Sequence, residues 1–283
     1  MKFSVFTVMA PDTTPERMIH YLKETGYDGV EWRFKETPEE VKKQETSFWG
    51  NNLCTIDPAI SDQEIQQLAQ TAKENGIETF SVTPYLTSGD LEATERVLDV
   101  AKKFGAKSIR LGVPRYDRSS NYHDLYQGAL HYLQEAEQMC KQYGVKGLVE
   151  THHQTITPSA SLAYRLVRSL NPDHIGVLYD PGNMVHEGYE NYRMGMELLG
   201  DYLAHVHVKN AQWVKQTDDD QVNWQVQWAQ LDKGVVDWKQ VLTDLKAVGY
   251  DGNIGMEDFS NAYPTKESLK FNLDAIKKLV NGV

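Results

Sequence analysis

The chain has 283 residues, a formal net charge of -11 and a hydrophobic content of 40%. This length and content allow a sizeable α/β core, and the acidic balance argues against a nucleic-acid partner, which normally needs a basic face. No apolar run approaches the ~20 residues of a membrane span, and the N-terminal run is too short and too β-like for a signal peptide. With two cysteines, Cys54 and Cys140, we expect a cytoplasmic protein without a disulfide framework.

Short β-type runs alternate with longer amphipathic helical runs along the chain. In chain order the β-type runs cover residues 2–8, 29–34, 78–84, 107–113, 145–150, 175–180, 203–210 and 252–258. Lysine followed by glycine marks the helix ends, as in "KETGYDG" and "KQYGVK". Helix starts are marked by Thr14-Pro15 and by the capping-box spacing of Ser61 and Glu64.

Eight βα units in one chain predict a parallel, eight-stranded (β/α)8 TIM barrel, with a single domain over residues 1–283. The alternative is an open, doubly wound α/β sheet. The barrel is favoured because no glycine-rich dinucleotide fingerprint follows the first strand.

Two connections are too long for the minimal unit. Residues 35–60 follow the second expected strand, and residues 211–236 follow the seventh and resemble a hairpin around an Asp-rich turn. Because both follow a strand, we expect them at the C-terminal face of the barrel, where active sites are built. Long insertions at this face usually wall or cover a pocket.

Four consecutive strands end in a side chain that can bind a metal. These are Glu150 in "LVETHH", Asp180 in "YDPGN", His207 in "HVHVKN" and Glu257 in "GMEDF". Three converging carboxylates would repel one another strongly without a cation. An oxygen-rich set with one imidazole suits Mn²⁺, Mg²⁺ or Co²⁺, with Zn²⁺ as a further option.

Each of these residues also has a simpler explanation. Asp180 could start a turn before Pro181, and Glu257 could pair with a lysine. His205 and His207 share one face of a strand, because alternate side chains point the same way. His205 lies one pleat deeper in the barrel, so we interpret His207 as the ligand and His205 as hydrogen-bonded support.

At these motifs the sequence resembles the xylose-isomerase-like TIM barrels, the sugar phosphate isomerase/epimerase group. The resemblance runs over the whole chain and includes "GYDGVEWR", "GVLYDPGN", "LAHVHVKN", "GVVDW" and "GYDGNIGMED". It implies one divalent metal, with Mn²⁺ preferred over Mg²⁺, Co²⁺ or Zn²⁺, held by Glu150, Asp180, His207 and Glu257. It also implies that Glu150 and Glu257 act as catalytic acid/base groups.

The implied reaction is proton transfer next to the carbonyl of a keto-sugar, through an enediolate that a divalent ion stabilises. Two carboxylates that reach the same carbon give epimerisation, and transfer between carbons gives isomerisation. Loss of a β-hydroxyl gives dehydration, so a keto-sugar or inosose dehydratase is the alternative enzyme. A non-catalytic sugar-binding barrel is a third hypothesis.

Further side chains are candidates for substrate contacts. His152 and Lys209 lie two residues beyond Glu150 and His207 and therefore face the same way. The other candidates are Glu31, Arg33, Trp49, Arg110 and Asn183. Glu31 and Arg33 could instead form a buried pair, Lys209 could neutralise a carboxylate, and Trp49 could pack within its loop rather than against a sugar. His153 is expected to face outward or into its loop.

The sequence departs from the family pattern at two positions. Asn183 stands where family members often carry a histidine, and Asp232 stands where a glycine is common. The related apurinic endonucleases use a multi-metal cluster with more histidines, so a nuclease is disfavoured. The segment "FSNAYPTKESL" lacks a glycine cradle for a phosphate. We expect a small-molecule sugar or cyclitol substrate, no nucleic acid and no membrane, with a homodimer as a possible assembly.

Overall fold

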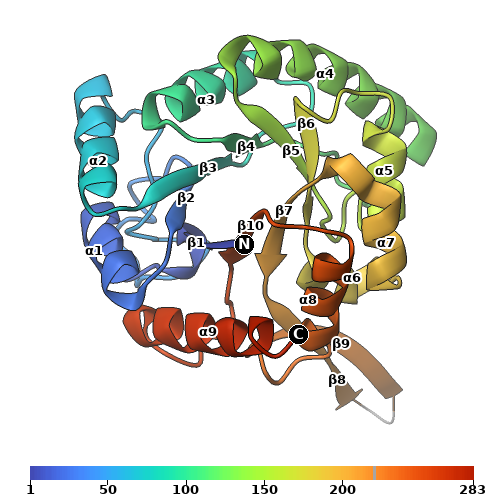
Figure 1. The fold of residues 1–283 in the computed structure, drawn as a ribbon. Coiled ribbons are helices and arrows are strands. Elements are labelled where there is room, and N and C mark those ends of the chain that lie inside the picture. The colour runs from blue at the N-terminus through green and yellow to red at the C-terminus, as the bar shows by residue number, and fades with distance from the viewer. Residues whose placement is uncertain (219–220) are drawn as a thin grey trace.

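The computed structural model describes residues 1–218 and 221–283. Within them, eight parallel strands close into a barrel in the order β1-β10-β7-β6-β5-β4-β3-β2 (Figure 1). The barrel strands are β1 (Lys2–Phe6), β2 (Gly29–Phe34), β3 (Glu78–Pro84), β4 (Ser108–Arg110), β5 (Lys146–Glu150), β6 (Ile175–Tyr179), β7 (Leu203–Val208) and β10 (Asn253–Met256). Because β1 pairs with both β2 and β10, the sheet has no edge there, which excludes the open sheet and confirms the predicted barrel.

Helices form a ring around the strands (Figure 1). They are α1 (Pro15–Thr25), α2 (Asp62–Glu74), α3 (Leu91–Phe104), α4 (Tyr122–Tyr143), α5 (Ala160–Val167), α6 (Pro181–Glu187), α7 (Tyr192–Leu199), α8 (Trp238–Ala247) and α9 (Thr265–Val280), with 3-10 turns η1 (Thr7–Met9) and η2 (Gly200–Tyr202). Thr14 caps α1 with Pro15 at its first turn, and Ser61 and Glu64 form the predicted capping box of α2.

Alternation along the strands separates an apolar outer face from a polar interior. Val30 and Trp32 of β2, and Val206 and Val208 of β7, join the hydrophobic core between the sheet and the helices. Their neighbours in sequence therefore point into the barrel. This places Glu31 and Arg33 of β2, and His205 and His207 of β7, inside a space where a polar group needs a partner.

β4 is shorter than predicted, since it covers residues 108–110 rather than 107–113. After Arg110 the chain runs directly along the backbone of residues 86–88, and a Cβ at Gly112 would lie 2.4 Å from the carbonyl oxygen of Leu86. A glycine is therefore needed for this approach, and the segment leaves the strand ladder there.

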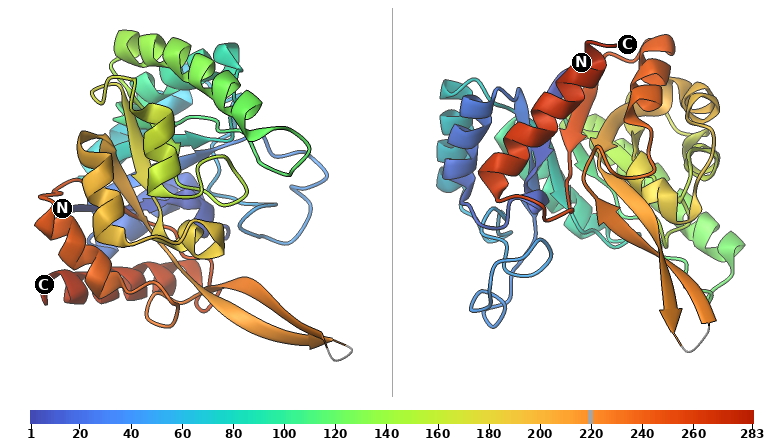
Figure 2. Two further views of the ribbon diagram at one scale, coloured as in Figure 1. Left: turned by 90° about the vertical axis from the view of Figure 1, so that its right-hand side faces the viewer. Right: turned by 90° about the horizontal axis from the view of Figure 1, so that it is seen from below.

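The second long connection folds as the predicted hairpin. β8 (Asn210–Asp218) and β9 (Gln221–Ala229) pair antiparallel from Asn210 opposite Ala229 to Asp218 opposite Gln221. Residues 219–220, at the expected Asp-rich turn, lie outside the described residues. Figure 2 shows the hairpin and the connection after β2 extending from the same end of the barrel, away from the N-terminus. Both insertions therefore lie on the predicted face.

The 35–60 connection is tied to the barrel by Arg33. Its guanidinium donates to Thr55 Oγ1 at 2.6 Å, to the carbonyl oxygen of Trp49 at 3.1 Å and to Tyr85 Oη at 3.2 Å. Asn52 adds a hydrogen bond from its amide to the carbonyl oxygen of Val8 at 2.8 Å. The loop that carries Trp49 is therefore held against the barrel mouth by buried polar contacts.

Cys54 and Cys140 are both buried and free. Within the described part of the chain, every helix is too short or too polar to cross a membrane.

Candidate metal centre

The four strand-end side chains predicted as ligands converge at the C-terminal end of the barrel. Glu150 ends β5, Asp180 follows β6, His207 lies in β7 and Glu257 follows β10. Each offers one ligand atom within 4.8 Å of the others, and all four side chains are buried. The Nδ1 atom of His207 lies 3.3 Å from Glu257 Oε2, 3.8 Å from Glu150 Oε1 and 3.9 Å from Asp180 Oδ2.

The two carboxylate oxygens of Asp180 make different contacts. Its Oδ1 atom accepts a hydrogen bond from the backbone N–H of Asn183 at 2.9 Å, which caps α6. Its Oδ2 atom faces the cluster and lies 2.8 Å from Lys209 Nζ. One oxygen therefore anchors the carboxylate, and the other remains available to a cation.

Two cations and one amide stabilise the carboxylates of this cluster. Lys209 forms ion pairs with both Asp180 and Glu257, and Arg110 donates to Glu150 Oε2 at 2.7 Å. The side-chain amide of Asn183 donates to Glu150 Oε1 at 3.1 Å and to Asp180 Oδ2 at 3.0 Å. Lys209 thus neutralises carboxylates, one of the two roles expected for it, and Asn183 holds two of the candidate ligands in place.

Burial and neighbouring charges act in opposite directions on these groups. Burial would raise the pKa of Glu150, but Arg110, and after it His152 and Lys209, bring that pKa below its usual range. Burial raises the pKa of Asp180 to about 6. The positive charge of Lys209 opposes this rise, and the negative charges of Glu257 and Glu150 add to it. Burial would lower the pKa of His207, but the carboxylates of Glu257 and Glu31 raise it well above its usual range. The cluster therefore attracts positive charge at His207.

The residues present fit a divalent cation. His207 Nδ1 is buried without a hydrogen-bond partner, and three carboxylates surround it. Glu31, Glu150, Asp180 and Glu257 contribute four negative charges, against which Lys209 and Arg110 supply two positive ones. One divalent ion would balance the remainder, and three oxygens with one imidazole suit Mn²⁺, Mg²⁺, Co²⁺ or Zn²⁺.

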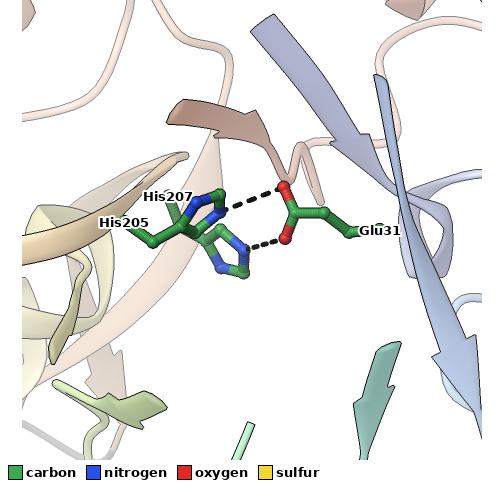
Figure 3. Close-up of side chains that lie close together, drawn as sticks. All are labelled: Glu31, His205 and His207. Atoms are coloured by element: carbon green, nitrogen blue, oxygen red, sulfur yellow. Dashed lines mark hydrogen bonds and ion pairs between the residues drawn. The ribbon is translucent and has the colours of Figure 1, made fainter. Parts of the chain in front are cut away.

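Glu31 faces both His205 and His207 (Figure 3). Neither Glu31 nor His205 is part of the four-residue ligand cluster. His207 Nε2 lies 2.9 Å from Glu31 Oε2, and His205 Nε2 lies 3.1 Å from Glu31 Oε1. Asn253 contacts the other ring nitrogen of His205 at 3.0 Å. His205 is therefore a hydrogen-bonded histidine of the barrel interior, as predicted from its deeper position on the strand.

Glu31 and Arg33 do not occupy the positions predicted for substrate contacts. Both are 1% exposed, and neither lines the cavity above the cluster. They do not form the alternative buried pair either, since Glu31 bonds to the two histidines and Arg33 to the 35–60 connection. Glu31 thus holds the two histidines of β7, and Arg33 holds the 35–60 connection.

A cavity of about 510 Å³ opens above the cluster and contains the remaining candidates. Its walls include the predicted residues Trp49, Arg110, Glu150, His152, Asn183, Lys209 and Glu257, together with Trp228 and Phe259. Trp49 is 51% exposed and its ring centroid lies 4.6 Å from that of Phe259. Trp228 comes from the hairpin, so both long connections supply an aromatic wall, as insertions at this face were expected to do.

The orientation predicted for His153 is wrong. His153 lines the cavity, its Nδ1 lies 3.1 Å from Asn183 Oδ1, and its ring stacks at 3.9 Å on His186. Burial, with help from His152 and His186, lowers the pKa of His153 to about 3, so the ring is neutral near pH 7. The chain turns immediately after Glu150, so strand alternation no longer applies at residue 153. Its stacking partner His186 lies in the last turn of α6.

The relationship to known proteins follows from a match over most of the chain. Residues 19–279 match the xylose isomerase-like TIM barrel family. The chain belongs to this family. The resemblance recognised in the strand-end motifs is therefore confirmed. No curated protein sequence matches the chain.

Solved structures of the same barrel are similar over their full length. The IolI protein with a bound zinc atom has a TM-score of 0.76 at 18% identity, over 100% of this chain and 99% of that chain. The 3-keto-D-glucoside 4-epimerase YcjR from E. coli has a TM-score of 0.72 at 18% identity, over 98% and 99%. The probable 3-DHS dehydratase AsbF from Bacillus anthracis has a TM-score of 0.70 at 17% identity, over 98% and 99%. At these identities the likeness concerns the fold.

The two histidines of β7 should respond differently to removal. His207→Ala should weaken divalent binding by about tenfold or more, because it removes a ligand atom. His205→Ala should lower the free energy of unfolding by about 1–3 kcal/mol, because it leaves Glu31 and Asn253 short of a buried partner, and should leave metal affinity largely intact. Calorimetric titration with Mn²⁺ and urea unfolding of each variant would measure both effects. Reversed effects would contradict the assignment of His207 as the ligand.

Metal binding by the metal-free protein should release protons. The pKa of His207 is raised well above its usual range, and that of Asp180 to about 6, so an ion that binds both must displace protons from them. Divalent affinity should therefore rise with pH between about 5 and 8. Titrations in two buffers of different ionisation enthalpy would count the protons. Fewer protons should be released at the upper end of this pH range, where Asp180 is already ionised. An affinity independent of pH would contradict the expectation.

Proposed function

We propose that this chain is a divalent-metal-dependent sugar isomerase or epimerase that moves a proton next to the carbonyl of a keto-sugar. The observation that carries the proposal is the placement of two glutamates, Glu150 and Glu257, in one ligand cluster at the floor of an aromatic-walled cavity. Both are buried, and a ligand atom of each lies within 4.8 Å of ligand atoms of His207 and Asp180.

A divalent ion, when bound, would stabilise the negative charge that develops on a carbonyl oxygen and its neighbouring hydroxyl. Glu150 and Glu257 would move the proton. Burial alone would raise the pKa of each, but Arg110 for Glu150 and Lys209 for Glu257 hold it below its usual range, so both are ionised and can accept a proton near pH 7. If one glutamate takes the proton from carbon and the other returns one to the opposite face, the product is the epimer.

The remaining candidates divide into supporting and substrate-facing groups. Arg110 and Asn183 already donate to the carboxylates, so we assign them to holding Glu150 and Asp180 in position. His152, Lys209 and Trp49 line the cavity and are the proposed substrate contacts. A cavity of about 510 Å³ suits a small sugar or cyclitol, and an aromatic wall suits the apolar face of a sugar ring.

A dehydratase is the second candidate, because loss of a β-hydroxyl begins with the same proton abstraction. His152 and Lys209 are cavity groups that could protonate the leaving hydroxyl. The structural neighbours include both an epimerase and a probable dehydratase. We further propose that the protein works in the cytoplasm, which the two free cysteines support.

The decisive experiment follows solvent deuterium. The purified protein with Mn²⁺ in D₂O would be screened by NMR over keto-sugars and inososes. Deuterium entering the recovered sugar or its isomer supports an isomerase or epimerase, and a product lacking one hydroxyl supports a dehydratase. Metal binding without any exchange or turnover over the panel would count against an enzyme of this class and favour a sugar-binding barrel.

Glu150→Gln and Glu257→Gln should each keep a measurable metal site, because glutamine retains an oxygen donor of the same size. Each should lose about 10²–10⁴-fold in turnover, the usual size of a general acid/base contribution. Asp180→Asn should lose metal affinity and activity together. Glu135→Gln is a matched control, since Glu135 is an exposed residue of α4 outside the cavity lining and should leave turnover unchanged. Full exchange and turnover in both glutamine variants would refute the two-carboxylate mechanism.

A further inference from the structure

We infer that Glu31 is a positioning residue that holds the imidazole of His207 with its Nδ1 atom directed at the metal site. The inference rests on the metal site of the proposed function, but not on the reaction carried out there. It starts from the contact drawn in Figure 3, where one carboxylate faces two imidazoles from the other side of the barrel.

Glu31 reaches His207 across two intervening strands. β2 and β7 are separated in the barrel by β1 and β10. At this level the intervening strands carry two small residues, Ser4 of β1 and Gly255 of β10. Ser4 pairs with Gly255, and Gly255 pairs with His207. A Cβ at Gly255 would lie 2.1 Å from Glu31 Oε1 and 3.0 Å from His205 Nε2. The glycine therefore leaves the space that the glutamate occupies.

Among the described residues, the carboxylate of Glu31 only accepts hydrogen bonds. Ser4 Oγ donates to Oε1 at 2.5 Å, and Asn253 in turn donates to Ser4 Oγ at 2.9 Å. His205 faces the same oxygen, and its other nitrogen accepts from Asn253, which places its proton on Nε2. A carboxylate that only accepts requires a proton on His207 Nε2 as well, 2.9 Å from Oε2.

This arrangement leaves His207 Nδ1 as the nitrogen for the ligand cluster. That atom is buried without a hydrogen-bond partner and lies 3.3 Å from the nearest carboxylate oxygen, on Glu257. An imidazole that donates its second N–H to a carboxylate has a fixed ring orientation and is a stronger metal ligand. Glu31 thus orients a metal ligand without itself contacting the metal.

Glu31, His205 and His207 are also close enough together to be considered as a second metal site. The hydrogen bonds argue against this, because the Nε2 atoms of the two histidines already pair with the two carboxylate oxygens of Glu31. Within the described residues the group offers three metal-binding side chains, one fewer than a tetrahedral structural site requires, and their exposure is only 0–4%. One ion per chain is therefore expected.

The test compares metal affinity in two variants by titration with Mn²⁺ alone and Zn²⁺ alone. Glu31→Gln keeps the shape but lacks a carboxylate to accept from both rings, and should weaken binding about 10–100-fold, the usual cost of losing such a partner. Ser4→Ala is the matched control, because it removes a hydrogen bond to the same carboxylate without touching His207, and should bind like the wild type. Wild-type affinity in folded Glu31→Gln, an equal loss in both variants, or two ions per chain would overturn the inference.

A second measurement needs no variant of Glu31. In the zinc-loaded wild-type protein, the Nε2–H of His207 should give a slowly exchanging signal in ¹⁵N-resolved NMR, identified by its loss in His207→Ala. Its absence, or a metal-bound Nε2, would overturn the inference even if Glu31→Gln failed to fold. Because neither readout uses a sugar, a chain that shows both but turns over no substrate would refute the proposed reaction and leave the role of Glu31 intact.

Discussion

Negative charge gathered toward the C-terminal end of the barrel is the constraint on which the rest of the interior depends. The effective cost of burying one ion is several kcal/mol unless it is paired. Glu31, Glu150, Asp180 and Glu257 are all buried, because parallel strands in a closed barrel bring their ends together. Arg110, Lys209 and His205 each pair with one or two of these carboxylates. His207 lies 2.9–3.9 Å from an oxygen of all four.

The buried carboxylates are paired in two layers of side chains, and His207 contacts both layers. The upper layer holds the three carboxylates of the ligand cluster, with Lys209 and Arg110. The lower layer holds Glu31, with Ser4 and His205, and is closed by hydrogen bonds. Each ring nitrogen of His207 faces one layer, so the hydrogen bond in the lower layer fixes the orientation of the ring in the upper layer.

Local pattern predicted the upper layer well and the lower layer poorly. Strand ends and period-two alternation were sufficient to place Glu150, Asp180, His207 and Glu257 together and to set His205 one level deeper. The partner of Glu31 could not be predicted in this way, because it depends on a contact across two intervening strands and on the space left by Gly255.

Turns and loops were the other limit of the sequence pattern. Arg33 proved to hold the 35–60 connection, and that role depends on how a long loop returns to the barrel. His153 follows the end of β5, where the chain leaves the strand and side-chain direction no longer follows alternation. β4 ended early for a similar reason, since the backbone of residues 86–88 passes beside it.

The cavity walls, rather than the ligand cluster, distinguish among the reactions considered for this chain. Epimerisation, isomerisation and dehydration all begin with removal of a proton next to a carbonyl, and the glutamates proposed as acid/base groups would serve in each. The three reactions differ in the later proton transfer, which goes to the same carbon, to a neighbouring carbon or to a leaving hydroxyl. That depends on how a substrate lies between His152, Lys209 and the aromatic side chains, and Trp49 and Trp228 come from the two long connections. Changes in these two connections would therefore alter which of the proposed reactions is favoured, while leaving the buried charge balance undisturbed.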